Sequence, residues 1–313
     1  MRVFKVIHPG VYTTLQDSGR VGYMKYGIPA SGAADRFSAR VANLLAGNLP
    51  EAAVLETTLF RLDLLALEDL VIAVTGGDLS PRVNQEPLPM WQGVGVKSGD
   101  RISFGGRKKG FRSFLAVRGG FAGPRFLGSR SVFARGLMGN PFQAGEILER
   151  AEGAARPPFL APLPADLLPD FSRRSSLRVI LGPQEDRFSR QGVETFLSSE
   201  YTVSPQSDRM GYRLDGPKIE HTQGADIISE GIARGAVQVP GDGLPIIMLW
   251  DAQVSGGYTK IANVISADLD GLAQVMPGEK LRFSGGTLEE AHRALREERE
   301  RLATVRRLME GLH

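Results

Sequence analysis

The chain has 313 residues, 42% of them hydrophobic, which predicts about two domains that each bury a core. Its 38 lysines and arginines exceed its 35 acids by only three charges, and no run of five or six like charges occurs, which argues against a nucleic-acid partner. The lack of cysteine excludes disulfides, thiolate zinc sites and a cysteine nucleophile, and it fits a reducing cytoplasm.

Neither a secretion signal nor a membrane anchor is predicted. Pro9 interrupts the N-terminus before the apolar core of a signal peptide could form. The most apolar stretch, residues 59–74, is interrupted by Arg61, Asp63, Glu68 and Asp69, so it is not expected to cross a bilayer. We therefore expect a cytoplasmic protein with no membrane partner.

Short β-branched and apolar segments, separated by Gly, Pro and Asp, predict a mainly β protein. Such segments occur at residues 71–74, 113–117, 177–181 and 246–250. Their regular turn signals favour antiparallel barrels or sandwiches over a doubly wound sheet. A Gly-acid turn before an alternating strand also occurs at residues 98–104 and again at 277–283, with a partial copy at 144–148, which indicates two related barrels.

Two helices are predicted beside these strands. Asp35 is placed to cap a helix that Gly47 ends and whose apolar face carries Phe37, Val41, Leu44 and Leu45. Near the C-terminus, Thr287 and Glu290 form a capping-box pattern before an amphipathic helix. Prolines concentrated between them predict a linker, and the expected domains are residues 1–153, linker 154–176, residues 177–286, and helix 287–313.

Standard catalytic motifs are missing from the sequence. It contains no G-x-x-x-x-G-K-[ST] phosphate loop and no G-x-S-x-G nucleophile elbow. The four histidines have no metal-ligand spacing, so no metal site is predicted, and His221 is interpreted as an ordinary hydrogen-bonding residue.

Polar side chains in glycine-rich turns of the second half are the main candidates for a site. Arg209 and Arg213 flank Tyr212, and guanidinium groups suit a carboxylate or phosphate. Amide and carboxylate groups that could orient an amide or ureido group come from Glu230, Gln238 and Asp242, and a second cluster from Asp251, Gln253, Tyr258 and Lys260. A structural interpretation competes at each position: Asp208 and Arg209 could form a turn with an ion pair, and Asp242-Gly243 suits a hairpin turn.

Four segments in the first half of the sequence carry further residues of the same kind as these turns. They are residues 13–20, 27–35, 43–48 and 55–58. Together with residues 207–214 they resemble the biotin-dependent carboxyltransferase-like family, which includes the C-type subunits of 5-oxoprolinase, allophanate hydrolase subunit 2-like proteins, KipA proteins and the carboxyltransferase region of urea carboxylase. The sequence departs from the family's D-x-Q-T-T-G-G-Y-P-K pattern at Val254, Ser255 and Thr259.

The resemblance implies two cyclophilin-like β-barrel domains and a role as the C-type subunit of an ATP-dependent 5-oxoprolinase. Such a subunit would cleave the lactam of 5-oxoproline to glutamate together with an A-type and a B-type, KipI-like, subunit. One alternative is a carboxyltransferase subunit that acts on urea or another amide, with biotin carried on another chain. The other is a non-catalytic, KipA-like regulator.

If the chain is a C-type subunit of a 5-oxoprolinase, as the resemblance implies, individual residues can be given expected roles. The expected catalytic residues are Glu230, Asp242 and Lys260. The expected substrate-binding residues are Arg209, Arg213, Tyr212, Gln238, Gln253, Tyr258, Asp17, Arg20 and Ser31.

Overall fold

The computed structural model describes residues 1–151, 156–171 and 176–310. The ends of the predicted linker and the last three residues of the predicted C-terminal helix lie outside this range. The chain divides into two compact units, and each is described separately. The first comprises residues 1–20, 31–171 and 299–313, and the second comprises residues 21–30 and 172–298. Residues 21–30, predicted in the first domain, thus belong to the second unit. The C-terminal helix, predicted as a separate element, is divided between the two units at residue 299.

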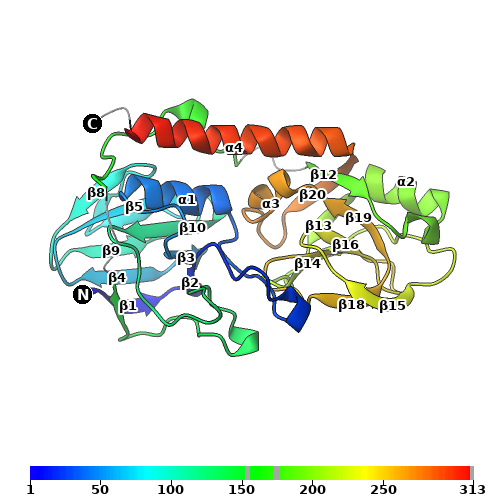
Figure 1. The fold of residues 1–313 in the computed structure, drawn as a ribbon, viewed down its shortest axis with the longest axis horizontal. Helices are drawn as coiled ribbons and strands as arrows, with labels where there is room; N and C mark the ends of the chain where they lie inside the picture. The colour runs from blue at the N-terminus through cyan, green and yellow to red at the C-terminus, as the bar shows by residue number, and fades with distance from the viewer. Residues whose placement is uncertain (152–155, 172–175, 311–313) are drawn as a thin grey trace. The chain divides into compact units, whose positions relative to one another are not determined.

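The first unit contains two antiparallel sheets (Figure 1). One has the strand order β11-β1-β4-β9-β6-β7 and the other β2-β3-β10-β5-β8. The bounds are β1 Arg2–Pro9, β2 Tyr12–Gln16, β3 Val54–Thr58, β4 Leu62–Ala66, β5 Leu70–Asp78, β6 Pro81–Val83, β7 Glu86–Pro87, β8 Gly93–Val96, β9 Arg101–Phe104, β10 Lys109–Val117 and β11 Ile147–Glu149.

Both faces of the sheet that contains β10 are buried. Leu115 and Val117 point into a core shared with the other sheet, whereas Phe114 and Ala116 point into a second core. Because successive strand residues face opposite sides, a strand covered on both sides needs an unbroken apolar run. The sequence Phe114–Val117 provides one.

Helix α1 (Arg36–Leu45) covers that second face, beside β5 and β10 (Figure 1). Asp35 caps it, with its carboxylate accepting from Ser38 N at 2.9 Å and from Ser38 Oγ at 2.7 Å. Gly47, directly after the helix, has φ of 82°, a conformation that glycine adopts without strain. The helix predicted from these residues is confirmed.

The second unit contains a closed barrel with the strand order β12-β19-β16-β17-β14-β13-β20. A parallel pairing of β20 with β12 closes it. The bounds are β12 Ser176–Leu181, β13 Glu200–Val203, β14 Gly211–Asp215, β16 Ala236–Gln238, β17 Ile246–Met248, β19 Lys260–Val264 and β20 Lys280–Gly285. A separate ribbon pairs β15 (Asp226–Gly231) with β18 (Ser255–Tyr258).

Short helices complete the second unit. They are α2 (Arg190–Ser198) and α3 (Ser266–Leu272), with 3₁₀ turns η1 (Met24–Tyr26) and η4 (Glu185–Arg187). The first unit has the 3₁₀ turns η2 (Ala134–Gly136) and η3 (Ala165–Leu167). Phe196 of α2 stacks on Phe283 of β20 with ring centroids 4.3 Å apart, which fixes α2 on the barrel wall.

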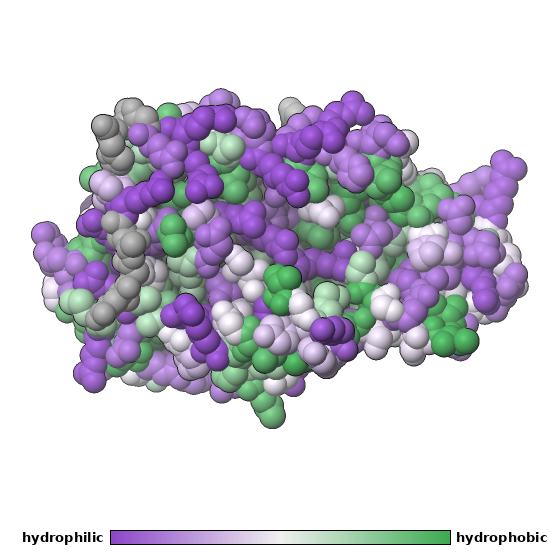
Figure 2. Space-filling view, in the orientation of Figure 1, coloured by the Kyte–Doolittle hydropathy of each residue, from purple (hydrophilic) through white to green (hydrophobic). Residues whose placement is uncertain are grey.

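The last helix, α4 (Leu288–Glu310), begins at the predicted capping box. Thr287 N donates to Glu290 Oε2 at 2.8 Å, and Glu290 N donates to Thr287 Oγ1 at 3.2 Å. In Figure 2 the visible side of this helix is largely hydrophilic. Among the described residues, no helix combines the length and apolarity needed to span a membrane.

The mainly β architecture expected from the sequence is confirmed, as are a β-barrel and a C-terminal helix. The barrel lies in the second unit. In the first unit the strands pair as two sheets around a shared core, and β5 and β10 also pack against α1 on their other face.

Candidate functional site

Four polar residues of the second unit meet around one ion pair. Glu230 lies on β15, Gln238 ends β16, Lys260 begins β19, and Gln184 precedes η4. We call Gln184, Glu230, Gln238 and Lys260 the glutamate–lysine cluster. Three of them were predicted as site residues from the sequence, and Gln184 was not.

Gln184 lies next to Lys260 because the backbone at Gly182 packs closely against the backbone of Lys260. Gly182 follows β12, and a Cβ atom there would lie 2.3 Å from the carbonyl oxygen of Lys260, so only glycine fits. Gly182 N also donates to Ile261 O at 2.7 Å. The side-chain amide of Gln184 then reaches both partners: Oε1 accepts from Lys260 N at 3.2 Å, and Nε2 donates to Glu230 Oε1 at 2.8 Å.

The Glu230 carboxylate pairs with the Lys260 ammonium through Oε1, the oxygen that also accepts from Gln184. In the described part of the chain no partner is recorded for Oε2. The Lys260 side chain is 7% exposed and that of Glu230 is 44% exposed. The ammonium is therefore buried, and the carboxylate reaches solvent. Hydrogen bonds from Lys260 and Gln184 lower the pKa of Glu230 from its usual value, which keeps it an ionised acceptor near neutral pH.

Gln238 brings an unsatisfied donor to the same place. Its side chain is 2% exposed, and among the described residues its Nε2 has no hydrogen-bond partner. Gly256, which pairs with Glu230 across the β15–β18 ribbon, lies against it, and a Cβ atom at Gly256 would be 3.2 Å from that nitrogen. A buried donor left unpaired costs about 1–3 kcal/mol, so the amide is suited to a ligand acceptor.

Arg209 is held in a buried ion pair away from solvent. Its Nε donates to Asp251 Oδ2 at 2.8 Å, and Asp251 N donates back to Arg209 O at 2.9 Å. The two side chains are 7% and 8% exposed. Tyr212, 1% exposed, donates from its hydroxyl to Val275 O at 3.0 Å. Both contacts stabilise the fold, and binding of substrate by these residues stays a prediction.

The other predicted residues of the second unit lie on its surface. Asp242 accepts from Leu244 N at 3.0 Å beside Gly243, as the turn interpretation predicts. Arg213 is exposed on β14, Tyr258 is 42% exposed on β18, and Gln253 is exposed just before that strand. In the described ranges no hydrogen bond or ion pair joins these four to the cluster, although a Cβ atom at Gly256 would lie 3.8 Å from Gln253 Nε2.

Thr259, where the sequence departs from the family pattern, makes contacts that a proline could not make. Its Oγ1 lies 3.0 Å from His221 Nε2 and 3.3 Å from Val239 O. His221 also lies 3.1 Å from Val239 O. Burial lowers the pKa of His221, although the hydrogen bond with Val239 opposes that shift. The hydroxyl therefore ties two segments together beside Lys260.

In the first unit, Asp17 is the centre of a hydrogen-bond network. Its Oδ1 accepts from Gly19 N, Ser129 Oγ and Ser131 Oγ at 2.8, 2.6 and 2.7 Å. Its Oδ2 accepts from Arg130 N at 2.6 Å. Burial raises the pKa of Asp17, but these hydrogen bonds outweigh it, and the net effect is a lowered pKa.

Arg20 and Ser31, the other candidates of the first unit, are also buried. Arg20 is 1% exposed and donates to the carbonyl groups of Ser131 and Phe126. Ser31 is fully buried, with φ of 53°. A buried pair that sequence reasoning missed, Arg112 and Glu56, has an Nε to Oε1 distance of 3.6 Å.

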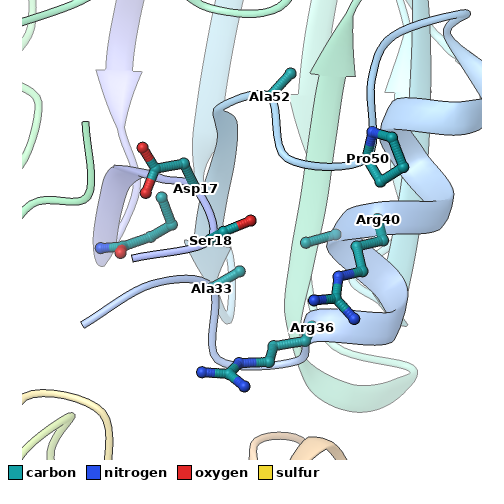
Figure 3. Close-up of a pocket in the computed structure, with 9 residues that line it drawn as sticks. Asp17, Ser18, Ala33, Arg36, Arg40, Pro50 and Ala52 are labelled. Carbon is teal, nitrogen blue, oxygen red and sulfur yellow. The ribbon is translucent and has the colours of Figure 1, made fainter. Parts of the chain in front are cut away.

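A small cavity of about 20 Å³ opens beside Asp17. Arg36 and Arg40 extend from α1 along one side, and Ser18 and Ala33 lie opposite (Figure 3). This volume holds about one water molecule. In the described part of the chain, no three His, Asp or Glu side chains gather in a way that could hold a metal ion.

Comparison with known proteins identifies the family. The family model "Carboxyltransferase domain, subdomain A and B" matches residues 26–285. The chain belongs to this family. The resemblance inferred from the sequence is thereby confirmed.

Two groups of relatives cover almost the whole chain. The C-type subunit of the Escherichia coli 5-oxoprolinase is 36% identical over 93% of this chain and 94% of its own length. The urea amidolyase of Lachancea kluyveri is 35% identical over 90% of this chain but only 17% of its own length. The crystal structure of the K. lactis urea amidolyase superposes with a TM-score of 0.91 at 31% identity, and this chain spans 20% of that protein.

Proposed function

We propose that the chain is the C-type subunit of an ATP-dependent 5-oxoprolinase, which opens the lactam of 5-oxoproline to glutamate together with A- and B-type subunits. Its 36% identity to the C-type subunit of a 5-oxoprolinase, over almost the whole of that subunit, supports this. The observation that carries the proposal is the unpaired amide of Gln238, which lies against Gly256, the partner of Glu230 across the β15–β18 ribbon.

The lactam presents a matching pair of groups. In a five-membered lactam the N–H and the C=O lie on the same side of the ring, so one edge offers one donor and one acceptor. Gln238 Nε2 is a donor for the carbonyl oxygen, and Glu230 Oε2 is an acceptor for the N–H. Both protein groups are available in the described structure, and satisfying Gln238 removes the penalty of its buried, unpaired donor.

Lys260 supplies positive charge at the same place. Its ammonium has three N–H donors, and Glu230 takes one, which leaves donors for negative charge that develops on the carbonyl oxygen when the amide is attacked. Water would attack the carbonyl carbon and give a proton to Glu230 as the C–O bond forms. The C–N bond would then break, and the Glu230–Lys260 pair would return that proton to the departing nitrogen. ATP would supply the driving energy in the assembled complex. Asp242 stays a predicted catalytic residue.

The urea amidolyase likeness supports a second candidate, carboxyl transfer from biotin carried on another chain. The ureido ring of biotin also presents N–H and C=O on one edge, so the same two contacts would suit it. Substrate chemistry decides between the two candidates.

Reconstitution tests the proposal. The purified chain is mixed with A- and B-type partners, 5-oxoproline and ATP, and glutamate release is measured. We expect release that requires all three proteins and ATP. If the chain instead carboxylates urea with a biotinylated carrier and releases no glutamate, the second candidate is correct. If it does neither while binding a B-type partner, a regulatory role replaces both.

A further inference from the structure

A tight turn in the first unit sets two arginines opposite each other. Phe126 N donates to Ser129 O at 2.8 Å, and Ser129 N donates to Phe126 O at 3.2 Å, so these residues form a hydrogen-bonded antiparallel pair. Arg125 and Arg130 are the next residues outward on the two arms. In such a ribbon the next pair is not hydrogen-bonded, and its side chains project from one face at close separation.

The turn is anchored on both arms. Asp17 accepts from Ser129 Oγ and Arg130 N, each at 2.6 Å. Arg20, which is 1% exposed, donates to the carbonyl groups of Phe126 and Ser131. Because these groups hold both arms, the backbone positions of Arg125 and Arg130 cannot separate without breaking these bonds.

No acid of the described chain forms an ion pair with either arginine, although the charge of Asp17 partly offsets the repulsion at Arg130. Neither Arg125 nor Arg130 has a side-chain hydrogen bond or ion pair among the described residues, and Arg130 Nε is buried without an acceptor. Asp17 already accepts four hydrogen bonds from other groups. Burial, and then the charge of Arg125, lower the pKa of Arg130, as expected where two guanidinium groups repel each other.

The backbone conformation at the tip of the turn is also strained. Leu127 has φ of 55° and Gly128 has φ of 83°, which are the angles of a type I′ turn. Leucine rarely adopts a positive φ because its Cβ approaches the backbone. Backbone strain and uncompensated like charges at one anchored turn are features that cluster at ligand sites.

We propose that Arg125 and Arg130 form a binding site for a phosphate group, either inorganic phosphate or the phosphate of a nucleotide. Two guanidinium forks offer several donors to one multiply charged anion with several acceptor oxygens. Binding would remove the repulsion between the arginines and give Arg130 Nε an acceptor. The site shares no residue with the glutamate–lysine cluster, so it is tested separately from the proposed lactam chemistry.

Calorimetric titration of the full chain with inorganic phosphate and with ATP tests this site. We compare the wild type with Arg125→Gln and Arg130→Gln, and use Arg118→Gln as control, since Arg118 is exposed and its substitution removes the same charge. Each substitution at the site should weaken phosphate binding by about tenfold or more, whereas the control should leave it nearly unchanged.

The two ligands distinguish the sources of phosphate. Similar affinity for both indicates a site for the phosphate group itself, and binding of ATP alone indicates a nucleotide site. No binding of either ligand, or equal weakening by Arg118→Gln, would overturn the proposal.

Thermal unfolding gives a second readout that needs no enzyme activity. Without phosphate, Arg125→Gln should unfold at or above the wild-type temperature, because it removes repulsion and no contact. Phosphate should raise the unfolding temperature of the wild type and of Arg118→Gln but not of Arg125→Gln. If phosphate stabilises all three proteins equally, these arginines do not bind it.

Discussion

Gln184 donates a 2.8 Å hydrogen bond to the Glu230 oxygen that also pairs with Lys260. Through its own Oε1 it accepts from the backbone of Lys260 at 3.2 Å. One amide therefore contacts both members of the ion pair and leaves the second carboxylate oxygen of Glu230 without a bond to either. On the proposed function, Gln184 would position Glu230 and Lys260 without touching the substrate itself.

Replacing Gln184 by leucine should lower kcat of the assembled enzyme by about ten- to a hundredfold, with a smaller change in KM. Gln184 is one of the groups that lower the pKa of Glu230, so its loss raises that pKa toward the usual value. If activity requires ionised Glu230, the acid limb of the pH–rate profile should therefore shift to higher pH. The measurement is a pH–rate profile. The control is Gln191→Leu, at an exposed position of α2. An acid limb that does not move in the Gln184 variant would contradict a positioning role for Gln184.

Lys260→Met should reduce turnover by a factor of about one hundred or more, because it removes positive charge aimed at the developing oxyanion. Methionine retains most of the buried stem, and the Glu230 side chain is 44% exposed, so the fold should survive. Turnover and circular dichroism are compared with Lys218→Met, an exposed lysine. Wild-type turnover in a folded Lys260→Met protein would exclude the lysine from the reaction.

Arg209→Ala should destabilise the protein by about 3–5 kcal/mol, because it leaves the Asp251 carboxylate buried without its partner. Arg213→Ala, at an exposed position, should change stability by about 0.5 kcal/mol or less. Urea denaturation measures both. An Arg209→Ala protein of wild-type stability but lost activity would restore the substrate-binding interpretation.

Asp17→Asn should destabilise the first unit by about 2 kcal/mol or more at neutral pH, since four donors converge on this carboxylate. The pKa of Asp17 is lowered by folding. Its stabilisation is therefore present above the usual aspartate pKa and is lost as pH falls through the lower folded value. Denaturation from pH 7 to pH 3 should show the wild type and the variant converging at acid pH, and a constant difference would contradict this.

Local signals predicted local structure well. Asp35 and the Thr287–Glu290 pair were placed correctly because a cap depends on residues within one turn of the helix. The alternation of apolar and polar residues likewise indicated strands, and the mainly β fold followed.

Partners distant in sequence could not be predicted in this way. Asp251 lies 42 residues from Arg209, and only the folded backbone brings them together. Gln184 lies 46 residues from Glu230, and its only sequence signal is the Gly-Pro turn before it. The two sheets of the first unit depend on which face α1 covers, which is decided by packing rather than by any one segment.

Gln238 and Glu230 are proposed to recognise the two groups of the lactam edge. Calorimetric titration of the assembled complex with 5-oxoproline and with its N-methyl derivative, which lacks the N–H, tests this recognition. N-methylation should weaken binding to the wild type by about tenfold or more. That penalty should persist in Gln238→Leu and disappear in Glu230→Met, because only Glu230 receives the N–H. An equal penalty in all three proteins, or equal binding of both ligands to the wild type, would show that Glu230 does not receive the lactam N–H.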